Sequence, residues 1–381
     1  MKKEMYSSEV TLLRDTFRRL LRRHAKTNIV KLIDKTHPSD LALIFRHFND
    51  TEQDSIFSNM SASEETVKFL YELDESIATR LIENETPERL AEIMEQASSN
   101  EQAFLMGLVN DQFASSVIDL LQAEEQEELE EMMAYPEDSA GILMYTDVFT
   151  LHEETKAREA IYALQDQEEA EMVFYLYTLD DDGRLTGVIS LRDLVTTPSD
   201  TMLKDIMSKN IQVVRPETDQ EEVARIVSQY NFLAVPVVDA NEKLLGIVTV
   251  DNVVDVIREE ATEDFLQLAG AGKDREILLK SSWENARIRL PWLFASWVGG
   301  ILAAFIIGIY NNILENAIAL AAFIPVIIGM GGNVGTQSST MIVRGLATGR
   351  VSFENSMKVL FKEMRVGLIL GTLYGILLGI N

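Results

Sequence analysis

Acidic side chains recur at helical spacing in the stretch DNVVDVIREEATEDFLQLAG, residues 251–270. The carboxylates of this stretch are Asp251, Asp255, Glu259, Glu260, Glu263 and Asp264. The first three stand four residues apart and would share one helix face, and the other three form a cluster one step around the helix. Like charges at this spacing repel and weaken an isolated helix. One interpretation is a solvated acidic face; the other is a site for a hard divalent cation, because such cations prefer carboxylate oxygens.

The position of the acidic stretch favours the cation interpretation. It lies on the connection between an acidic N-terminal region and long uncharged runs that begin at Leu290. A cation bound on this connection could control the part of the chain that follows. We therefore predict a metal site. Its ligands would be Asp255, Glu259, Glu260, Glu263 and Asp264.

A second candidate is PVIIGMGGNVGTQSSTMIV, residues 325–343, where neutral polar residues stand inside an apolar run. Gly331 and Gly335 form a GxxxG pair, which is typical of closely packed membrane helices. Packing accounts for the glycines, but Asn and Gln side chains would be costly against lipid. Pro325 and the glycines are expected to interrupt the helix and to turn backbone carbonyls toward a water-filled cavity. The stretch predicts a polar pathway for a solvated ion. Its pore-lining residues would be Gly331, Gly332, Asn333, Gly335 and Gln337.

Three apolar runs surround this stretch, and roughly 20 residues suffice to cross a bilayer. We expect spans at about 290–310, 316–343 and 358–380. The third run is uncharged only from Val366, and no Asp or Glu is expected inside any span. Lys and Arg precede the first run and fill the loop between the second and third, while the loop NNILEN has none. The positive-inside rule predicts a multi-pass protein of the cell (inner or plasma) membrane with cytoplasmic N-terminal domains.

Composition excludes several classes of function. The 381 residues carry a net charge of −27, which argues against nucleic acid as a partner, because a binder needs Lys and Arg to neutralise phosphates. The absence of cysteine excludes disulfides and thiolate metal sites. The four His are scattered and no nucleophile–base pair is visible, so we do not expect an enzyme. The N-terminus lacks the apolar core of a signal peptide.

Two repeats organise the region before the apolar runs. In residues 1–136, HPSDLALIF and TPERLAEIM repeat a unit with a cap, Pro at a helix start and apolar residues at helical spacing. Such recurrence indicates an α-helical, superhelical N-terminal domain. Next, LYTLDDDGRLTGVISLRDLV matches VPVVDANEKLLGIVTVDNVV, which indicates two small α/β units at 137–200 and 201–260. Units of this size should pack as a pair.

The two α/β units resemble a tandem cystathionine-β-synthase (CBS) pair, because the turn, the glycine and the helix start coincide twice. Such pairs are usually regulatory, and many bind adenine nucleotides between the repeats. The fold class expected is therefore a multi-domain membrane protein. Its parts are a helical N-domain, a tandem α/β CBS pair, a connecting, plug-like helix at 261–284 and an α-helical transmembrane region at 285–381.

The whole chain resembles the MgtE family of magnesium channels and transporters. IPVIIGMGGNVGTQSSTMIVRGLATG (324–349) is similar to the second membrane helix of that family, and FKEMRVGLILG (361–371) to the start of its third. The resemblance implies a homodimer in the lipid bilayer with a central pore that selects hydrated Mg²⁺. It also implies closure when cytoplasmic Mg²⁺ is plentiful and modulation by ATP at the CBS pair.

The resemblance also implies roles for single residues. Four of the predicted metal ligands fall on family cation-sensing positions, namely Asp255, Glu260, Glu263 and Asp264, whereas Asn231 and Asn252 stand where the family has Asp. The residues that match the family's nucleotide pattern are Tyr175, Arg192 and Asp193, with Phe232 as a weaker match. Asp193 would accept ribose hydroxyls and Tyr175 would stack on adenine. The Arg192–Asp193 pair also fits an ordinary helix start.

Family members have five membrane helices, and this chain reaches the third. The acidic pore residue of the family's fifth helix is absent from it. We therefore expect a fragment that does not conduct alone. The alternative function is a membrane-anchored regulator that senses nucleotide and cation without conducting.

Overall fold

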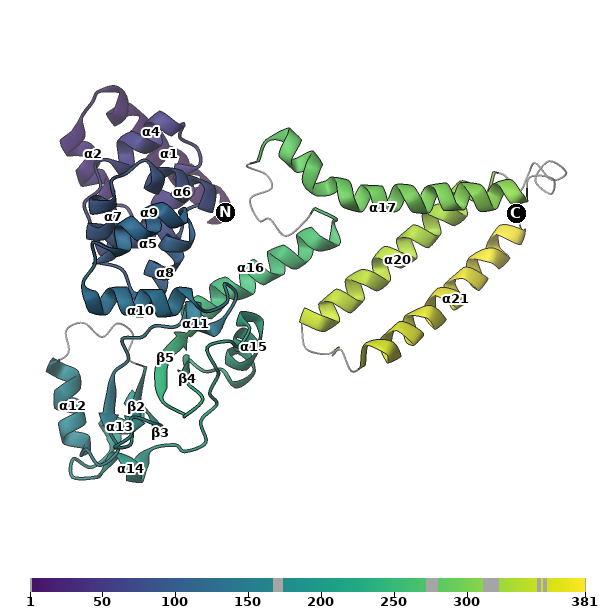
Figure 1. The fold of residues 1–381 in the computed structure, drawn as a ribbon. Helices are drawn as coiled ribbons and strands as arrows, with labels where there is room; N and C mark the ends of the chain where they lie inside the picture. The colour runs from purple at the N-terminus through teal and green to yellow at the C-terminus, as the bar shows by residue number, and fades with distance from the viewer. Residues whose placement is uncertain are drawn as a thin grey trace. The chain divides into compact units, whose positions relative to one another are not determined.

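The structure, a computed structural model, describes residues 2–166, 174–271, 280–310, 322–347, 351 and 355–380. The chain forms two compact units, Met1–Val256 and Ile257–Asn381 (Figure 1). The first unit holds the helical N-terminal region and both α/β repeats, and the second holds the apolar helices. The boundary falls inside one helix, α16 (Val250–Leu268).

Short helices make up the N-terminal region, as the sequence predicts. They are α1 (Lys2–Arg22), α2 (Lys26–Ile33), α3 (Pro38–Phe45), α4 (Asp50–Phe57), α5 (Glu64–Tyr71), α6 (Glu75–Glu83), α7 (Pro87–Met94), α8 (Ser99–Gly107), α9 (Asp111–Ile118) and α10 (Ala123–Met133). The repeated unit is visible in α3 and α7, which both begin at Pro. Proline suits the first turn because its missing N–H would have no helical partner there. His37 and Thr86 precede the two prolines, and their side chains cap the helices.

The core of this region is built from the apolar faces of the short helices. Phe45, Phe57 and Phe69 are almost fully buried. The rings of Phe45 and Phe69 meet edge to face with centroids 4.9 Å apart. Helices of eight or nine residues are marginal alone, so this shared burial holds them in place.

The first α/β repeat contains a three-stranded sheet. Its strands are β1 (Thr150–His152), β2 (Tyr175–Leu179) and β3 (Leu185–Ser190), in the order β1-β2-β3. β1 pairs parallel to β2, and β2 pairs antiparallel to β3. The helices packed with this sheet are α12 (Ala157–Asp166), α13 (Leu191–Thr196) and α14 (Leu203–Ile206), of which α14 comes from the start of the second repeat. The second repeat has an antiparallel pair of strands and two longer helices. These elements are β4 (Ala234–Val238), β5 (Leu244–Thr249), α15 (Gln220–Tyr230) and α16.

Segments at the ends of the repeats pair across the division expected between residues 200 and 201. The chain after α11 (Ala140–Leu143) joins the second repeat, where Tyr145 N–H donates to the Ile247 carbonyl at 2.8 Å. In return, Ser208 N–H donates to the Val188 carbonyl of the first repeat at 2.9 Å. Each repeat is therefore completed by chain from the other, which makes the pair one structural body within the first unit.

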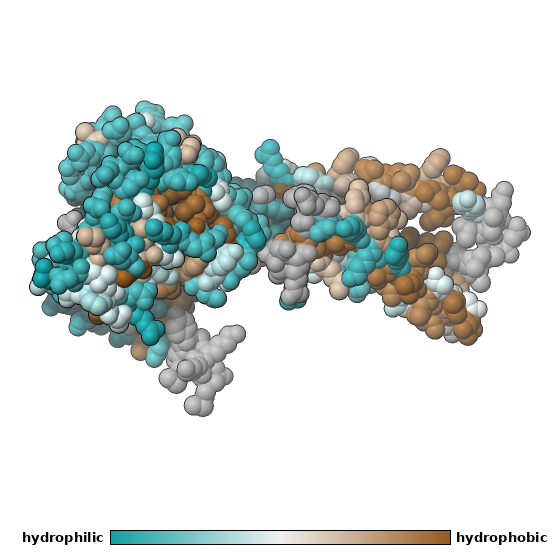
Figure 2. All heavy atoms as spheres, turned by 90° about the horizontal axis from the view of Figure 1, so that it is seen from below, coloured by the Kyte–Doolittle hydropathy of each residue, from teal (hydrophilic) through white to brown (hydrophobic). Residues whose placement is uncertain are grey.

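The second unit is dominated by long apolar helices. They are α17 (Ser282–Ile309), α20 (Ile324–Ala347) and α21 (Ser356–Ile380). In the described residues, α17 and the Met357–Ile380 part of α21 are long and apolar enough to cross a membrane. Figure 2 shows apolar side chains gathered over this unit and hydrophilic ones over most of the visible face of the first.

The structure differs from the expected second span in two ways. α20 is one continuous helix, so the expected interruption by Pro325 and the glycines is wrong. Pro325 is the second residue of the helix, where its missing N–H removes no helical hydrogen bond. In the described residues α20 is long enough to cross a membrane but less apolar than α17 and α21, because Gly, Asn, Gln, Ser and Thr lower its mean hydropathy. Residues 316–321 of the predicted span lie outside the described residues.

The third helix corrects the expectation that no acidic residue lies inside a span. Glu363 belongs to the Met357–Ile380 segment. Its carboxylate accepts a hydrogen bond from the Ser338 hydroxyl of α20. The predicted connecting helix also differs, because α16 continues from the second repeat to Leu268, and residues 272–279 of the connection lie outside the described residues.

Candidate nucleotide, cation and permeation sites

A cavity of about 240 Å³ lies between the two α/β repeats. Its lining residues are Tyr175, Tyr177, Val188, Ser190, Asp193, Ser208, Asn210, Ile211, Gln212, Phe232, Ala234 and Pro236. β2 and β3 of the first repeat and β4 of the second repeat all contribute lining residues. The structure therefore brings together three of the four residues predicted for nucleotide binding: Tyr175, Asp193 and Phe232.

Asp193 is held in place by the start of α13. The Ser190 hydroxyl donates to Asp193 Oδ2 at 2.7 Å, and Asp193 N–H donates to Ser190 Oγ at 3.1 Å. This arrangement fixes the carboxylate while leaving it exposed at the rim of the cavity. A fixed carboxylate with two acceptor oxygens suits the paired hydroxyls of a ribose.

Aromatic rings line the cavity from both repeats. Tyr175 and Tyr177 come from β2, with ring centroids 6.4 Å apart. Phe232 comes from the second repeat and stacks on Tyr230 with centroids 5.3 Å apart. Flat aromatic faces on two sides suit a planar base, since stacking is favourable for any π-system.

Sequence reasoning missed Tyr177 and the polar residues Asn210 and Gln212. Tyr177 is fully buried, and its hydroxyl has no hydrogen-bond partner among the described residues. Burial, with a smaller contribution from Tyr175, raises the pKa of this hydroxyl well above its ordinary value. Strand alternation could have found Tyr177, because side chains two residues apart point to the same face of a strand.

Arg192, the fourth predicted residue, does not line the cavity. Its side chain is exposed on α13. The neighbouring Asp193 does line it. Asp193 makes the hydrogen bonds of an ordinary helix start and also lines the cavity, so the two alternatives do not exclude each other.

The predicted metal ligands all lie on α16, as their spacing indicates. All five side chains are half-buried, namely those of Asp255, Glu259, Glu260, Glu263 and Asp264. Burial and the neighbouring Glu263 raise the pKa of the Asp264 carboxyl. The Gln267 amide donates to Glu263 at 2.7 Å. Within the described part of the chain, no three acidic or histidine side chains gather as a metal site. Magnesium keeps several waters and needs only one or two carboxylates, so a pair of neighbours on this helix matches its chemistry.

The two Asn residues at positions where the family resemblance leads us to expect Asp have structural roles here. Asn252 is buried; its amide donates to the Leu143 carbonyl at 3.0 Å, and its oxygen accepts from the Thr249 hydroxyl. A carboxylate could not donate to that carbonyl and would be buried with its charge. Asn231 ends α15 in the left-handed conformation, with φ of 54°. Asn adopts that conformation more readily than most residues.

Most side chains of α20 are exposed, including most of those in the neutral polar stretch. Asn333 and Gln337 stand four residues apart and are both exposed. A methyl group added at Gly331, Gly332 or Gly335 would meet nothing within 4 Å in the described residues. The close packing that a GxxxG pair would serve is thus not made within the described part of this chain.

Comparisons with known families match most of the chain. The family model described as "Divalent cation transporter" (MgtE) matches residues 324–381. The model described as "MgtE intracellular N domain" matches residues 36–138, and that of the CBS domain matches residues 140–200 and 203–259. The two CBS matches coincide with the two α/β repeats.

Named relatives and solved structures agree with these matches. The chain is 30% identical over 350 residues to the magnesium transporter MgtE of Bacillus subtilis (strain 168), across 92% of this chain and 77% of that protein. It is 40% identical over 263 residues to the magnesium transporter MgtE of Thermus thermophilus, across 68% of this chain and 58% of that protein. The structure of the cytosolic domain of the Mg²⁺ channel MgtE in complex with ATP is 31% identical, with a TM-score of 0.61, and covers 64% of this chain and 99% of that one.

Proposed function

Because the chain belongs to the MgtE family of divalent cation transporters, we propose that it forms part of a homodimeric membrane pore for Mg²⁺. The named relatives are transporters, and the chain is not an enzyme. Hydrated Mg²⁺ is the substrate of this pore. Cytoplasmic Mg²⁺ closes it, and ATP bound between the CBS repeats modulates the closure.

One observation carries the proposal for permeation. The amide side chains of Asn333 and Gln337 stand four residues apart on one face of α20, and both are exposed. Amide side chains that face lipid are costly. In the membrane this face must therefore be covered by a second helix, with water between the two. Two copies of α20 facing one another would form a path lined by amides and glycines. Amide oxygens and N–H groups can hydrogen-bond the water shell of a hydrated cation without binding it too tightly to leave.

The regulatory part of the proposal rests on α16 and the inter-repeat cavity. α16 begins inside the second repeat and carries its carboxylates beyond it. A cation bound there would couple the CBS pair to the following membrane helices. The cavity offers aromatic faces for an adenine and the Asp193 carboxylate for its ribose. On this proposal the N-terminal domain and the CBS pair are cytoplasmic and the apolar helices lie in the cell membrane.

The test of permeation replaces one amide on the exposed face. Asn333→Leu should abolish Mg²⁺ influx into proteoliposomes that hold the protein and a Mg²⁺-sensitive dye, while leaving its insertion intact. The matched control is Val334→Leu, which places the same apolar side chain at the neighbouring position without removing an amide. Normal influx through the Asn333→Leu protein would contradict the proposed path.

The alternative function is a membrane-anchored regulator that does not conduct. The cavity, with a Tyr177 hydroxyl that has no partner in the described part of the chain, favours a nucleotide-sensing role under either proposal. The same proteoliposomes separate the two proposals. ATP binding without Mg²⁺ influx, in protein that is inserted and dimeric, would favour the regulator.

A further inference from the structure

The charges of this acidic chain are unevenly distributed. The first 35 residues hold ten of its 34 Lys and Arg but only four of its 61 Asp and Glu. The basic residues centre on the sequence RDTFRRLLRRHAK, residues 14–26, at the end of α1. Neither the transport proposal nor the nucleotide proposal gives these residues a role.

The apolar face of α1 is already used by its own domain. Phe17 is fully buried in the core, and Leu13, Leu20 and Leu21 pack against that core. Among the side chains of α1 that the structure describes, Leu12 is the one large apolar residue left exposed, which is too little to form an apolar face. Whatever it binds on its outer side must be recognised by charge.

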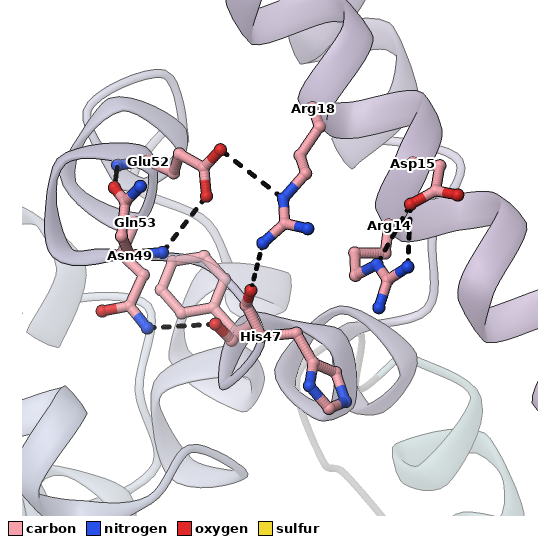
Figure 3. Close-up of polar contacts among 8 residues, drawn as sticks. Arg14, Asp15, Arg18, His47, Asn49, Glu52 and Gln53 are labelled. Atoms are coloured by element: carbon pink, nitrogen blue, oxygen red, sulfur yellow. Dashed lines mark hydrogen bonds and ion pairs between the residues drawn. The ribbon is translucent and has the colours of Figure 1, made fainter.

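Some of the arginines of α1 are engaged within the domain. Arg14 pairs with Asp15 at 2.9 Å. Arg18 donates to the His47 carbonyl at 2.6 Å and approaches Glu52 at 3.6 Å (Figure 3). Its guanidinium also lies 5.8 Å from the ring centre of Phe48. These contacts connect Arg18 of α1 to the first turn of α4 and the segment just before it.

The next three arginines have no such contacts. Arg19, Arg22 and Arg23 are exposed, and within the described part of the chain none of them makes a hydrogen bond or an ion pair. With Asp15 and Arg18 they line an open hollow of about 410 Å³. We call Arg18, Arg19, Arg22 and Arg23 the arginine surface. Three unpaired guanidinium groups around one hollow repel each other, and a bound anion would relieve that repulsion.

Guanidinium groups are suited to phosphate, because their planar donors match two phosphate oxygens at once. The chain itself indicates where phosphate is abundant. It carries helices that can cross a bilayer, so its N-terminal domain stays close to lipid headgroups at high effective concentration. The cytoplasmic leaflet is anionic and attracts basic segments of membrane proteins.

We propose that the arginine surface binds the phosphate groups of anionic lipids at the cytoplasmic face of the membrane. The proposal rests on the membrane attachment proposed above. Outside its first 35 residues the chain is strongly acidic, so the anionic leaflet repels most of the first unit and attracts this surface. Contact through α1 therefore orients the N-terminal domain on the membrane by charge alone.

The test uses the full chain in lipid nanodiscs. The chain has no cysteine, so Thr27→Cys, at an exposed position in α2, gives a single site for a fluorescent donor. The acceptor is placed on lipid headgroups. Energy transfer should be higher in discs that contain phosphatidylglycerol than in discs of phosphatidylcholine alone. It should fall with added salt, because exposed charges are screened beyond about 8 Å at physiological ionic strength.

The variant Arg19→Gln, Arg22→Gln, Arg23→Gln should lower the ratio of membrane-bound to unbound domain by about 100-fold, since each basic residue near the surface contributes about fivefold. Replacing the same three arginines by Lys should restore most of the binding, which shows that the fold is intact. The matched control, Arg158→Gln, Lys209→Gln, Lys243→Gln, removes the same charge from exposed positions elsewhere in the first unit and should leave transfer unchanged.

Equal transfer in the two kinds of disc, or in wild type and the Gln variant, would overturn the proposal. A soluble phosphate compound is the other possible ligand of the arginine surface. Calorimetry tests it by titrating inorganic pyrophosphate into the chain in phosphatidylcholine discs. Binding there that depends on the same arginines would assign the surface to a soluble phosphate compound and would also overturn it. A chain that does not co-elute with the disc would refute membrane attachment itself, whereas a chain that co-elutes without lipid dependence refutes only the arginine surface.

Discussion

The Ser338 hydroxyl of α20 donates a hydrogen bond of 2.8 Å to the Glu363 carboxylate of α21. The two residues are 25 positions apart, and the bond joins the helix with the neutral polar face to the helix that follows it. It also gives a partner to an acidic side chain inside a candidate membrane span. A carboxylate within a span is costly unless another polar group pairs with it.

Replacing Ser338 by Ala should therefore loosen the contact between α20 and α21. We expect the free energy of unfolding in detergent to fall by about 0.6 to 1.7 kcal/mol, the range for hydrogen bonds between membrane helices. Thr372→Ala is the control, because within the described residues the Thr372 hydroxyl bonds to the Leu368 carbonyl of its own helix and to no other helix. Equal losses in the two variants would show that the bond between the helices contributes nothing.

Nucleotide binding should depend on the Asp193 carboxylate. Asp193→Ala removes the proposed ribose acceptor and should weaken ATP binding by about 10- to 100-fold, as measured by calorimetry on the full chain. Asp200→Ala is the control, because it removes an exposed carboxylate that does not line the cavity. If both variants bind ATP as wild type does, the cavity is not the nucleotide site. Arg192→Gln, measured alongside, decides whether that exposed side chain reaches a phosphate.

Removal of the buried Tyr177 hydroxyl distinguishes a role of this group in nucleotide binding from a role in stability. Tyr177→Phe removes a hydroxyl that has no partner among the described residues, so the ligand-free protein should be unchanged or more stable by up to about 1 kcal/mol. If the hydroxyl hydrogen-bonds the nucleotide, ATP binding should weaken by about tenfold in the same variant. A loss of stability without loss of binding would contradict this assignment. Tyr162→Phe, at an exposed tyrosine of α12, is the control.

Magnesium should protect α16 from protease through its carboxylates. One divalent ion can bridge groups that monovalent ions only screen, so millimolar Mg²⁺ should protect residues 255–271 and K⁺ at matched ionic strength should not. Glu260→Gln with Glu263→Gln should remove most of this protection and leave the pore open at higher internal Mg²⁺. Glu124→Gln with Glu127→Gln removes the same charge from exposed positions in α10 and is the control. Equal protection by K⁺ would leave α16 as a solvated acidic face.

The same protection should depend on pH in a way set by Asp264. Its pKa is raised by burial and by Glu263, so it takes up a proton at a higher pH than an ordinary aspartate. A protonated carboxyl cannot bind Mg²⁺. Protection should therefore decline, as pH falls, before the ordinary aspartate pKa of about 3.9 is reached. Asp264→Asn should remove this early decline, and a profile identical to wild type would contradict it.

Most of the helices and strands could be predicted from the sequence alone. Apolar runs near Leu290 and Val366, the recurring Pro at helix starts and the duplicated turn-and-strand pattern are local signals, and the helices and strands follow them. Residues on one short segment were also predictable, because the spacing on a single helix fixes which of them share a face. The acidic residues of α16 and the amides of α20 are examples.

Only the tertiary structure decided which distant segments meet. Two examples are contacts between residues at least 25 positions apart: Tyr145 pairs with Ile247, and Ser338 bonds to Glu363. A third is the burial of Tyr177 beside a cavity that residues of the other repeat complete. Local composition does not determine such contacts, because they depend on how whole elements pack. The continuity of α20 was unpredictable for a similar reason. Glycine permits a break in a helix but does not require one, and a proline at the second position removes no helical hydrogen bond. Whether the helix continues therefore depends on its hydrogen bonds as a whole.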